Sequence, residues 1–451
     1  MNNTIGILRE SLSKKGEKRV AITPNLTKQI LEWGHEIIIQ PAVHPETREI
    51  KRAFPDQSYQ QLGVEINEDL SKANVIFGIK EIDIDKILAG KTYVFFSHTH
   101  KGQIKNLDML RTLVEKKSTV IDYELIRTEK NIRLITAFTF NAGYAGTVDT
   151  LWALGKRYAL KGLPNPFRRL RQAFEEEHLQ IAKNSFGIAA QEIETFGTPD
   201  KLPPCIVCIL GKGKTAHGVR EMLDILPHED IGIHQLKDIY ENGSRKKLYV
   251  LHIDVEEMYR LKEGSKFTAE YFKNLSVPEQ QQLYFNNPNE FETNLDIILP
   301  YITVLMNCIV WSKKYPRTVT KNLMKSVFAY HKTLMIIGDI SCDPNGSIEF
   351  SKETWIDNPI YIYNPETELA VDGFEEEGIG VLAVTNLPCE FSADASEQFS
   401  NDLKPIIKNI IRADYKDSFK DSELIPEVER AVIMWKGEFT KPFDYMKKFI
   451  T

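Results

Sequence analysis

The stretch CIVCILGKGKTA, residues 205–216, decides the fold of this chain. Its first half is an unbroken apolar run, which is typical of a strand buried on both faces of a parallel sheet. Its second half contains Gly-x-Gly-x-x-Ala at Gly211, Gly213 and Ala216, and the pattern after it predicts a helix over 217–226. In this order the first glycine permits a tight turn, the second lets the backbone approach a pyrophosphate, and the alanine keeps helix and strand close. The stretch therefore predicts a dinucleotide-binding turn, with a plain tight turn as the alternative.

The strand expected next, over 231–233, is followed by His234 and Gln235. A site for NAD usually has an acidic residue at this point, which binds the ribose hydroxyls. Its absence favours NADP over NAD. The basic run Arg245-Lys246-Lys247 is a candidate for the 2′-phosphate site, although a solvated basic loop explains the run more simply.

Two apolar runs nearer the N-terminus, over 75–79 and 93–97, stop at Lys80 and His98. In open parallel sheets the reacting groups lie just beyond the carboxyl ends of the strands, so we expect both residues to face one cleft. The alternative is that they are two unrelated surface residues. A further strand over 118–124 places Asp122 and Glu124 on one face at its end, and both carboxylates are expected in the same cleft.

Strands and helices alternate between residues 5 and 124, with helices expected from Pro24 to about Trp33 and near Asp69. The small residues 141–146 predict a turn into a long helix over 148–159, and a second α/β unit is expected after residue 204. The polar, aromatic stretch 262–294 is interpreted as an irregular insertion. The chain is therefore predicted to be an α/β protein of two or three domains.

The composition describes an ordinary globular protein. The chain has 451 residues, 42% of them hydrophobic and 27% charged, with a net charge of −6. This balance gives no electrostatic reason to bind nucleic acid or an anionic membrane. No apolar stretch reaches the roughly 18 residues that span a bilayer, and no signal peptide is recognised, so a cytoplasmic location is expected.

The five cysteines are scattered and predict no disulfide framework. Cys205 and Cys208 form a C-x-x-C, but strand geometry directs their thiols to opposite faces, so both are predicted to be core residues. The ten histidines show no metal-binding spacing, and no metal is expected.

Eight motifs, spread nearly end to end, carry a family resemblance. They are RVAITP (19–24), GIKE (78–81), KTYVFFSHT (91–99), IDYE (121–124), AGYAG (142–146), GDIS (338–341), GSIEF (346–350) and TNLP (385–388). Together they resemble the alanine dehydrogenase and saccharopine dehydrogenase superfamily, and most closely its lysine-ketoglutarate reductase branch. The resemblance implies two Rossmann-like domains with parallel sheets flanking an interdomain cleft. Residues 1–140 plus 386–451 would form the catalytic domain, and 141–385 the dinucleotide-binding domain with the insertion near 262–294.

The same resemblance implies roles for individual residues. Lys80 and His98 would be the catalytic acid and base, and Arg19, Glu17 and Glu124 would bind substrate and set the charge balance. A planar guanidinium suits a carboxylate, although Arg19 in a surface ion pair is the alternative. The cofactor-binding residues would be Gly211, Gly213, Lys214, Ala216, Arg133, Asn307, Asp339 and Ser341.

The implied activity is the condensation of L-lysine with 2-oxoglutarate and reduction of the imine by NADPH, or by NADH, to L-saccharopine. A separately encoded glutamate-forming saccharopine dehydrogenase is the expected partner enzyme, because the chain ends at Thr451. The alternatives are another amino-acid or opine-type dehydrogenase, such as alanine dehydrogenase, and a nucleotide-binding sensor without activity. His100 and Cys342 depart from the family pattern, and whether they alter substrate choice is left open, as is a homo-oligomer.

Overall fold

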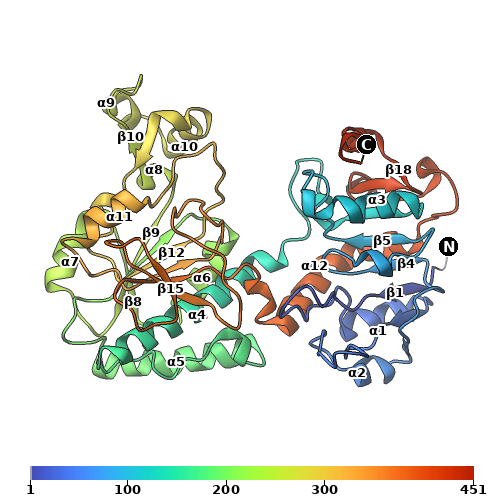
Figure 1. Cartoon of the computed structure of the whole chain (residues 1–451), viewed down its shortest axis with the longest axis horizontal. Coiled ribbons are helices and arrows are strands. Elements are labelled where there is room, and N and C mark those ends of the chain that lie inside the picture. Colours follow the sequence, from blue (N-terminus) through green and yellow to red (C-terminus); the bar gives the residue numbers. More distant parts are fainter. Residues whose placement is uncertain (1–2, 451) are drawn as a thin grey trace. The chain divides into compact units, whose positions relative to one another are not determined.

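The computed structural model describes residues 3–450, and the chain divides into two compact units (Figure 1). Unit 1 comprises Met1–Phe138 and Ser392–Thr451, and unit 2 comprises Thr139–Phe391. Each unit is built on its own eight-stranded sheet within the described residues. The expected α/β fold with two largely parallel sheets is confirmed.

The sheet of unit 1 has the strand order β18-β17-β6-β5-β4-β1-β2-β3. Its parallel strands are β1 (Ile5–Ile7), β2 (Ile37–Ile39), β3 (Glu65–Ile66), β4 (Val75–Phe77), β5 (Thr92–Phe95) and β6 (Thr119–Asp122), followed by antiparallel β17 (Val432–Trp435) and β18 (Glu438–Phe439). The helices are α1 (Pro24–Glu32), α2 (Asp56–Gln60), α3 (Leu107–Glu115), α12 (Ser392–Arg412) and α13 (Pro426–Glu429), with 3-10 turns η1 (Ile84–Lys86), η2 (Ile104–Asn106), η3 (Tyr123–Leu125), η9 (Phe419–Asp421) and η10 (Lys441–Phe449).

Both faces of this sheet are covered, which explains its continuous apolar strands. One face packs against α1 and α12, and the other against α3 and η10. Met446 of η10 is fully buried in the second of these cores. The last described segment of the chain is thus part of the unit 1 core.

The sheet of unit 2 has the order β15-β14-β16-β13-β12-β7-β9-β8. Its parallel strands are β7 (Ile206–Leu210), β8 (His228–Ile231), β9 (Leu248–Ile253), β12 (Val304–Asn307), β13 (Ile336–Asp339) and β16 (Ile379–Leu382), with antiparallel β14 (Ile360–Tyr363) and β15 (Ala370–Asp372) at one edge. One face packs against α4 (Ala137–Leu160), α5 (Leu179–Phe196) and α6 (Lys214–Leu223), and the other against α7 (Leu236–Asn242) and α11 (Lys321–Phe328). Shorter turns are η4 (Ala173–Glu175), η5 (Ile233–Gln235), η6 (Pro288–Glu290), η7 (Leu295–Ile297), η8 (Leu387–Cys389) and α8 (Val255–Met258).

The prediction of a turn over 141–146 is wrong, because these residues lie inside α4. Their small size serves helix packing instead. A Cβ on Gly143 would lie 2.2 Å from the backbone oxygen of Thr215 in α6, and one on Gly146 would lie 2.7 Å from the Ile340 side chain. Close approach of the backbone, rather than a bend, therefore explains these glycines.

The prediction of a helix near Asp69 is also wrong. Side chains there bind the backbone locally: Asn67 accepts from the Asp69 amide at 3.0 Å, and Asp69 accepts from the Ser71 amide at 2.8 Å. Such contacts compete with helical hydrogen bonds and favour turns. The helix of this region is α2, and it comes earlier in the chain.

The insertion near 262–294 is ordered rather than irregular. It contains α9 (Ala269–Lys273) and α10 (Val277–Asn286) between the antiparallel strands β10 (Tyr259–Leu261) and β11 (Phe291–Thr293). Aromatic rings form its core, with Tyr259 and Tyr284 stacked at a centroid distance of 4.7 Å. The polar composition of residues 262–294 gave no indication of this small core, because few aliphatic residues contribute to it.

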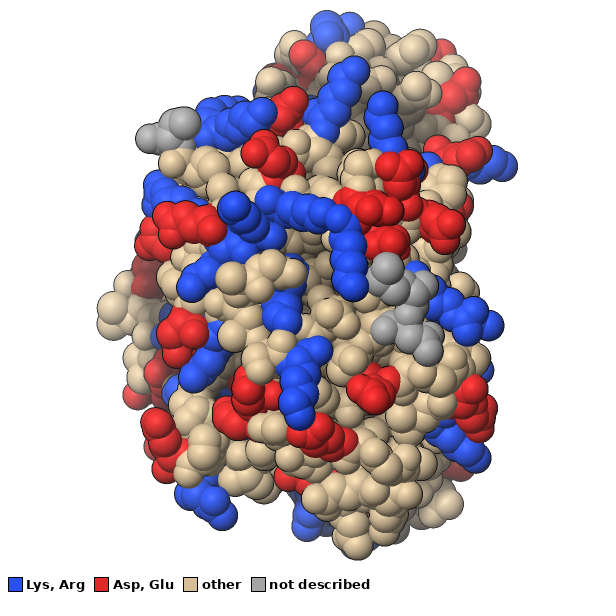
Figure 2. All heavy atoms as spheres, turned by 90° about the vertical axis from the view of Figure 1, so that its right-hand side faces the viewer, with Lys and Arg blue, Asp and Glu red and all other residues tan. Residues whose placement is uncertain are grey.

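The surface agrees with the modest net charge. On the face drawn in Figure 2, Lys and Arg side chains alternate with Asp and Glu side chains. Within residues 3–450 no helix combines the length and the apolar character that crossing a membrane requires.

Candidate active site

Lys80 and His98 follow two neighbouring parallel strands of unit 1. β4 ends at Phe77 and β5 at Phe95, so each basic residue comes three positions after its strand. The strands pair directly, with Phe77 opposite Val94. Both residues therefore leave the sheet at the same edge, as the sequence predicted for their placement.

Glu81 orients the His98 ring. Its Oε1 lies 3.0 Å from His98 Nδ1, and its Oε2 lies 2.8 Å from Lys14 Nζ. Burial raises the pKa of the Glu81 carboxyl, but the hydrogen bonds from His98 and Lys14 outweigh burial and hold that pKa below its usual range. An ionised carboxylate on Nδ1 fixes the ring and makes Nε2 the nitrogen suited to exchange a proton with a ligand. His98 itself has a left-handed backbone, with φ of 49°.

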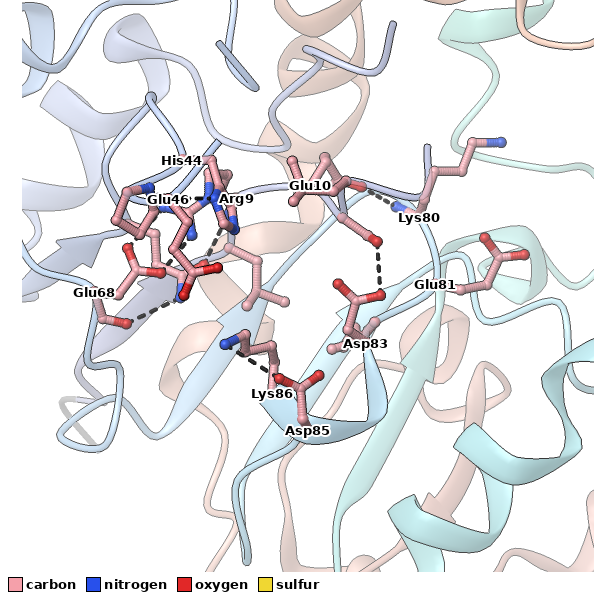
Figure 3. Close-up of a pocket in the computed structure, with 16 residues that line it drawn as sticks. Arg9, Glu10, His44, Glu46, Glu68, Lys80, Glu81, Asp83, Asp85 and Lys86 are labelled. Carbon is pink, nitrogen blue, oxygen red and sulfur yellow. Dashed lines mark hydrogen bonds and ion pairs between the residues drawn. The ribbon is translucent and has the colours of Figure 1, made fainter. Parts of the chain in front are cut away.

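Glu10 anchors the backbone at Lys80. Its two carboxylate oxygens accept the amide N–H groups of Ile79 at 2.7 Å and Lys80 at 2.9 Å. Burial, reinforced by the nearby Glu17, raises the pKa of Glu10 to about 8. Glu10 lines a pocket of about 460 Å³ at this edge of the sheet, whereas the Lys80 ammonium is directed away from the pocket's other labelled side chains (Figure 3). The sequence analysis missed Glu10, because only the fold brings residues 10 and 80 together.

Arg19 and Glu17 form a buried bidentate ion pair. Arg19 Nε donates to Glu17 Oε1 at 2.8 Å, and Nη2 donates to Oε2 at 2.6 Å. Both side chains are almost fully buried, and the Arg19 guanidinium lies 4.1 Å above the Phe138 ring. The alternative of a surface ion pair is therefore wrong: the pair is buried, and Glu17 fixes the plane of the guanidinium.

Asp122 and Glu124 do not share a strand face as predicted. β6 ends at Asp122, and Glu124 lies in η3. The buried Asp122 carboxylate caps this turn, because it accepts the Glu124 amide at 2.8 Å and the Ser97 hydroxyl at 2.6 Å.

The Glu124 carboxylate lies in a separate charged cluster. Lys101 Nζ is 3.1 Å away and Arg133 Nη2 is 2.8 Å away, while His100 Nε2 is 3.9 Å away. Burial raises the pKa of Glu124, but the surrounding cations outweigh it and lower that pKa overall. Arg133, assigned to the cofactor by resemblance, thus pairs with Glu124 in unit 1. Burial also lowers the pKa of His100, which favours a neutral imidazole.

The Gly211–Ala216 turn of unit 2 has the geometry of a phosphate cradle. Gly211 has φ of 88°, and its amide donates to Ile253 O at 2.9 Å. Gly213 caps α6, and a Cβ there would meet nothing within 4 Å. Lys214 is the first residue of α6, and Ala216 is fully buried. The open space above the helix N-terminus therefore fits a dinucleotide pyrophosphate.

The strand beside this turn is β9 and not β8. β7 pairs with β9, and β8 lies beyond β9 at the edge of the sheet. The residue after the strand beside the turn is therefore Asp254. The acidic residue was expected after the strand at 231–233, where His234 and Gln235 stand, but that strand is not the neighbour of β7. The signal that identifies this strand was present in the apolar run 248–253 and the acid that follows it.

Asp339 is held at the ends of two adjacent strands. Asn307 in β12 donates to Asp339 Oδ1 at 2.7 Å and to Ser347 at 2.8 Å, and Ser351 donates to Asp339 Oδ2. Burial raises the pKa of Asp339 to about 6. Ser341 donates to Ile309 O at 2.6 Å, which joins the turn after β13 to the segment after β12. The arrangement gathers Asn307, Asp339 and Ser341 at the same sheet edge as Gly211.

The C-x-x-C behaves as predicted. Cys205 belongs to the core on one face of the sheet and Cys208 to the core on the other. Among the described residues, no group of three or more His, Cys, Asp or Glu side chains is arranged to hold a metal ion.

Comparison with known proteins agrees with this geometry. The alanine dehydrogenase/PNT N-terminal domain model matches residues 6–145, and the corresponding C-terminal domain model matches residues 293–442. The chain is 31% identical to alpha-aminoadipic semialdehyde synthase of Arabidopsis thaliana, over 99% of this chain and 41% of that protein. It is 30% identical to the mitochondrial synthase of Bos taurus, over 96% of this chain and 46% of that protein. The chain thus spans less than half the length of these relatives.

A shorter relative is the NAD(+), L-lysine-forming saccharopine dehydrogenase of Candida albicans, which is 22% identical over 89% of this chain and 91% of that protein. Among solved structures, an L-alanine dehydrogenase matches with a TM-score of 0.60 and 15% identity, covering 99% of this chain and all of that chain. A transhydrogenase from Sinorhizobium meliloti matches with a TM-score of 0.55 and 13% identity, covering 97% of this chain and all of that chain. At these identities the solved structures support the fold alone.

Proposed function

This chain belongs to the alanine dehydrogenase/PNT family, and from that membership we propose that it joins the side-chain amine of L-lysine to 2-oxoglutarate and reduces the imine to L-saccharopine. The relatives named alpha-aminoadipic semialdehyde synthase and lysine-forming saccharopine dehydrogenase support this substrate pair. The observation that carries the proposal is the placement of Lys80 and His98 after adjacent strands, with Glu81 on His98 Nδ1.

The proposed reaction needs groups that move protons. The neutral lysine amine attacks the carbonyl carbon, the carbonyl oxygen takes up protons and leaves as water, and the imine carbon then accepts a hydride. His98 and Lys80 are proposed to hold and transfer these protons near neutral pH, at the carbonyl oxygen and the nitrogen. Arg19 is proposed to bind a substrate carboxylate while Glu17 fixes its plane, and Glu124 is proposed to complete the substrate site.

A nicotinamide dinucleotide would supply the hydride. Gly211, Gly213, Lys214 and Ala216 would hold its pyrophosphate, and Asn307, Asp339 and Ser341 would lie toward its nicotinamide end. NADP was favoured because no acidic residue follows the strand expected over 231–233. Because Asp254 follows the strand beside the turn, we propose that it binds the ribose hydroxyls and that NAD is preferred.

The test is nicotinamide oxidation at 340 nm with 2-oxoglutarate and a panel of amines. Lys80→Met and His98→Gln are expected to lower kcat by about 10²- to 10⁴-fold while NADH still binds, as followed by its fluorescence. Lys28→Met and His331→Gln serve as controls, because both side chains are exposed.

Each outcome of the panel has one meaning. Turnover specific for lysine supports the proposal. Turnover with pyruvate and ammonia would instead indicate an alanine dehydrogenase, and cofactor binding without turnover would indicate a sensor. Unchanged rates in Lys80→Met or His98→Gln would remove that residue from the mechanism.

A further inference from the structure

The loop that carries His98 is contacted by the far end of the chain. Tyr445 of η10 donates its hydroxyl hydrogen to the backbone oxygen of His100 at 2.7 Å, across 345 sequence positions. The Phe449 ring lies directly against Gly102, because a Cβ on Gly102 would be 2.6 Å from Phe449 Cζ. Two aromatic residues of one 3-10 segment therefore brace the turn that follows His98.

This turn needs support because its backbone is unusual. His98 and Gly102 both have positive φ, of 49° and 68°. A residue with a side chain adopts the left-handed region at a cost, and it stays there only when surrounding contacts hold it. The Gly102 amide donates to Thr99 O at 2.9 Å and so closes the turn. That bond does not fix the orientation of the whole turn, which depends on contacts with neighbouring segments.

Besides η10, the side chain of Glu124 contacts residues 100–102, at 3.1 Å from Lys101 Nζ, and the remaining supports act on the opposite end of the loop. Asn106, at the start of α3, donates to the carbonyl of His98 at 3.2 Å, and Glu81 holds the imidazole. Neither reaches residues 100–102 by a described hydrogen bond. The bracing segment is itself well anchored, because Met446 is fully buried and Phe443 nearly so, against β5 and α3.

We propose that η10 positions the His98 loop for proton transfer, with Tyr445 and Phe449 as positioning residues that act through His98. The inference rests on the proposed catalytic role of His98. It predicts that a change about 345 residues away in the sequence alters the chemistry of the histidine rather than substrate or cofactor affinity. The aromatic pair sets where the loop lies, and Glu81 then sets which imidazole nitrogen is presented.

The central experiment uses Tyr445→Phe in the whole chain. This change keeps the ring and removes one hydrogen bond, and Tyr445 is partly exposed, so the fold is retained. We expect kcat to fall about three- to tenfold, with KM and NADH affinity unchanged, because one net hydrogen bond contributes about 1 kcal/mol. We also expect the limb of the kcat/KM pH profile that reports His98 to move, which a purely structural loss would not cause.

A second pair of variants tests the packing against Phe449. Gly102→Ala is expected to lower kcat more than Gly63→Ala, the matched control with positive φ and nothing within 4 Å of its Cβ. Adding Phe449→Ala to Gly102→Ala removes the clash and should recover part of the lost turnover. No recovery, or equal losses in the two glycine variants, would overturn the role of Phe449.

A double-mutant comparison separates this inference from the proposed function. In a His98→Gln background, Tyr445→Phe should cause no further loss, because its effect passes through the histidine. If His98→Gln alone has wild-type rates, the proposed function fails. If His98→Gln loses turnover but Tyr445→Phe changes neither kcat nor the pH profile, or is additive with His98→Gln, the inference alone is overturned.

Discussion

A buried carboxyl pair in unit 2 makes its stability depend on pH. Asp149 in α4 and Glu390 after η8 are both almost fully buried and interact with each other, and Asp149 Oδ2 and both Glu390 oxygens find no other donor within the described residues. Two ionised carboxylates would repel each other in this place, so the pair is expected to keep one proton. The Ala173 amide donates to Asp149 Oδ1 at 2.7 Å and lowers the pKa of Asp149, but burial outweighs this bond and the charge of Glu175 adds to the effect of burial.

The expected magnitude follows from the pKa of Asp149, which burial raises from 3.8 to about 6. Two pKa units correspond to about 3 kcal/mol. Because the folded pKa lies above the unfolded one, this stability is fully present below pH 3.8 and is lost as the pH rises through about 6. Burial and then the charge of Asp149 also raise the pKa of Glu390, which extends the loss to higher pH.

The perturbation is Asp149→Asn, which removes the titrating carboxyl. The amide oxygen can still accept from the Ala173 amide, and the amide nitrogen can donate to Glu390. Because this variant lacks the stability loss that the raised pKa of Asp149 causes, it is expected to gain about 3 kcal/mol relative to wild type as the pH rises from about 4 to about 8. Glu194→Gln, an exposed change in α5, is the control and should follow wild type.

The assay is urea unfolding at several pH values, combined with hydrogen exchange at the Ala173 amide. The exchange measurement reports unit 2 even if the two units unfold separately. The difference between variants cancels the contributions of other titrating groups, such as Glu10. A pH dependence of Asp149→Asn within about 0.5 kcal/mol of wild type would refute the reasoning.

Three further predictions follow from packing and chemistry. Gly143→Ala is expected to lower the free energy of unfolding by at least about 2 kcal/mol, because the new Cβ meets backbone atoms that cannot move away. Gly187→Ala, in open space on α5, should raise it by up to about 1 kcal/mol. Thermal melting compares the two variants, and a stable Gly143→Ala would contradict the close approach. Asp254→Ser should weaken NADH binding about tenfold and NADPH binding less, and equal losses in fluorescence titrations would exclude a ribose contact. Cys205 and Cys208 should resist alkylation until the chain unfolds, because burial raises the pKa of both thiols, and rapid labelling of the native protein would disprove their core placement.

Local pattern predicted the parts of this protein that depend on neighbours in sequence. The apolar run before Gly211 and the glycine spacing after it identified the turn, because strand, turn and helix are contiguous there. Lys80 and His98 were singled out in the same way, since each comes three positions after a buried strand. The opposite facing of Cys205 and Cys208 needed only the two-residue period of a strand.

Tertiary structure decided which elements became neighbours. β8 follows the Gly211–Ala216 turn in sequence, yet β9 takes the place beside β7, so Asp254 rather than His234 follows the strand beside the turn. Strand order in a parallel sheet depends on how whole crossover units pack, and a local window carries no information about it. The glycines of α4 were mistaken for a turn for a related reason, because Gly143 approaches α6 and Gly146 approaches Ile340, and both partners lie far along the chain.

The candidate site shows the same division. The sequence alone determined which basic residues follow the two strands, Lys80 and His98. Only folding placed Glu10 on the amide of Lys80 and Tyr445 on the loop of His98, since these contacts join positions 70 and 345 residues apart. Candidate reacting groups can be proposed from short patterns, whereas the groups that hold them in place are selected by long-range packing.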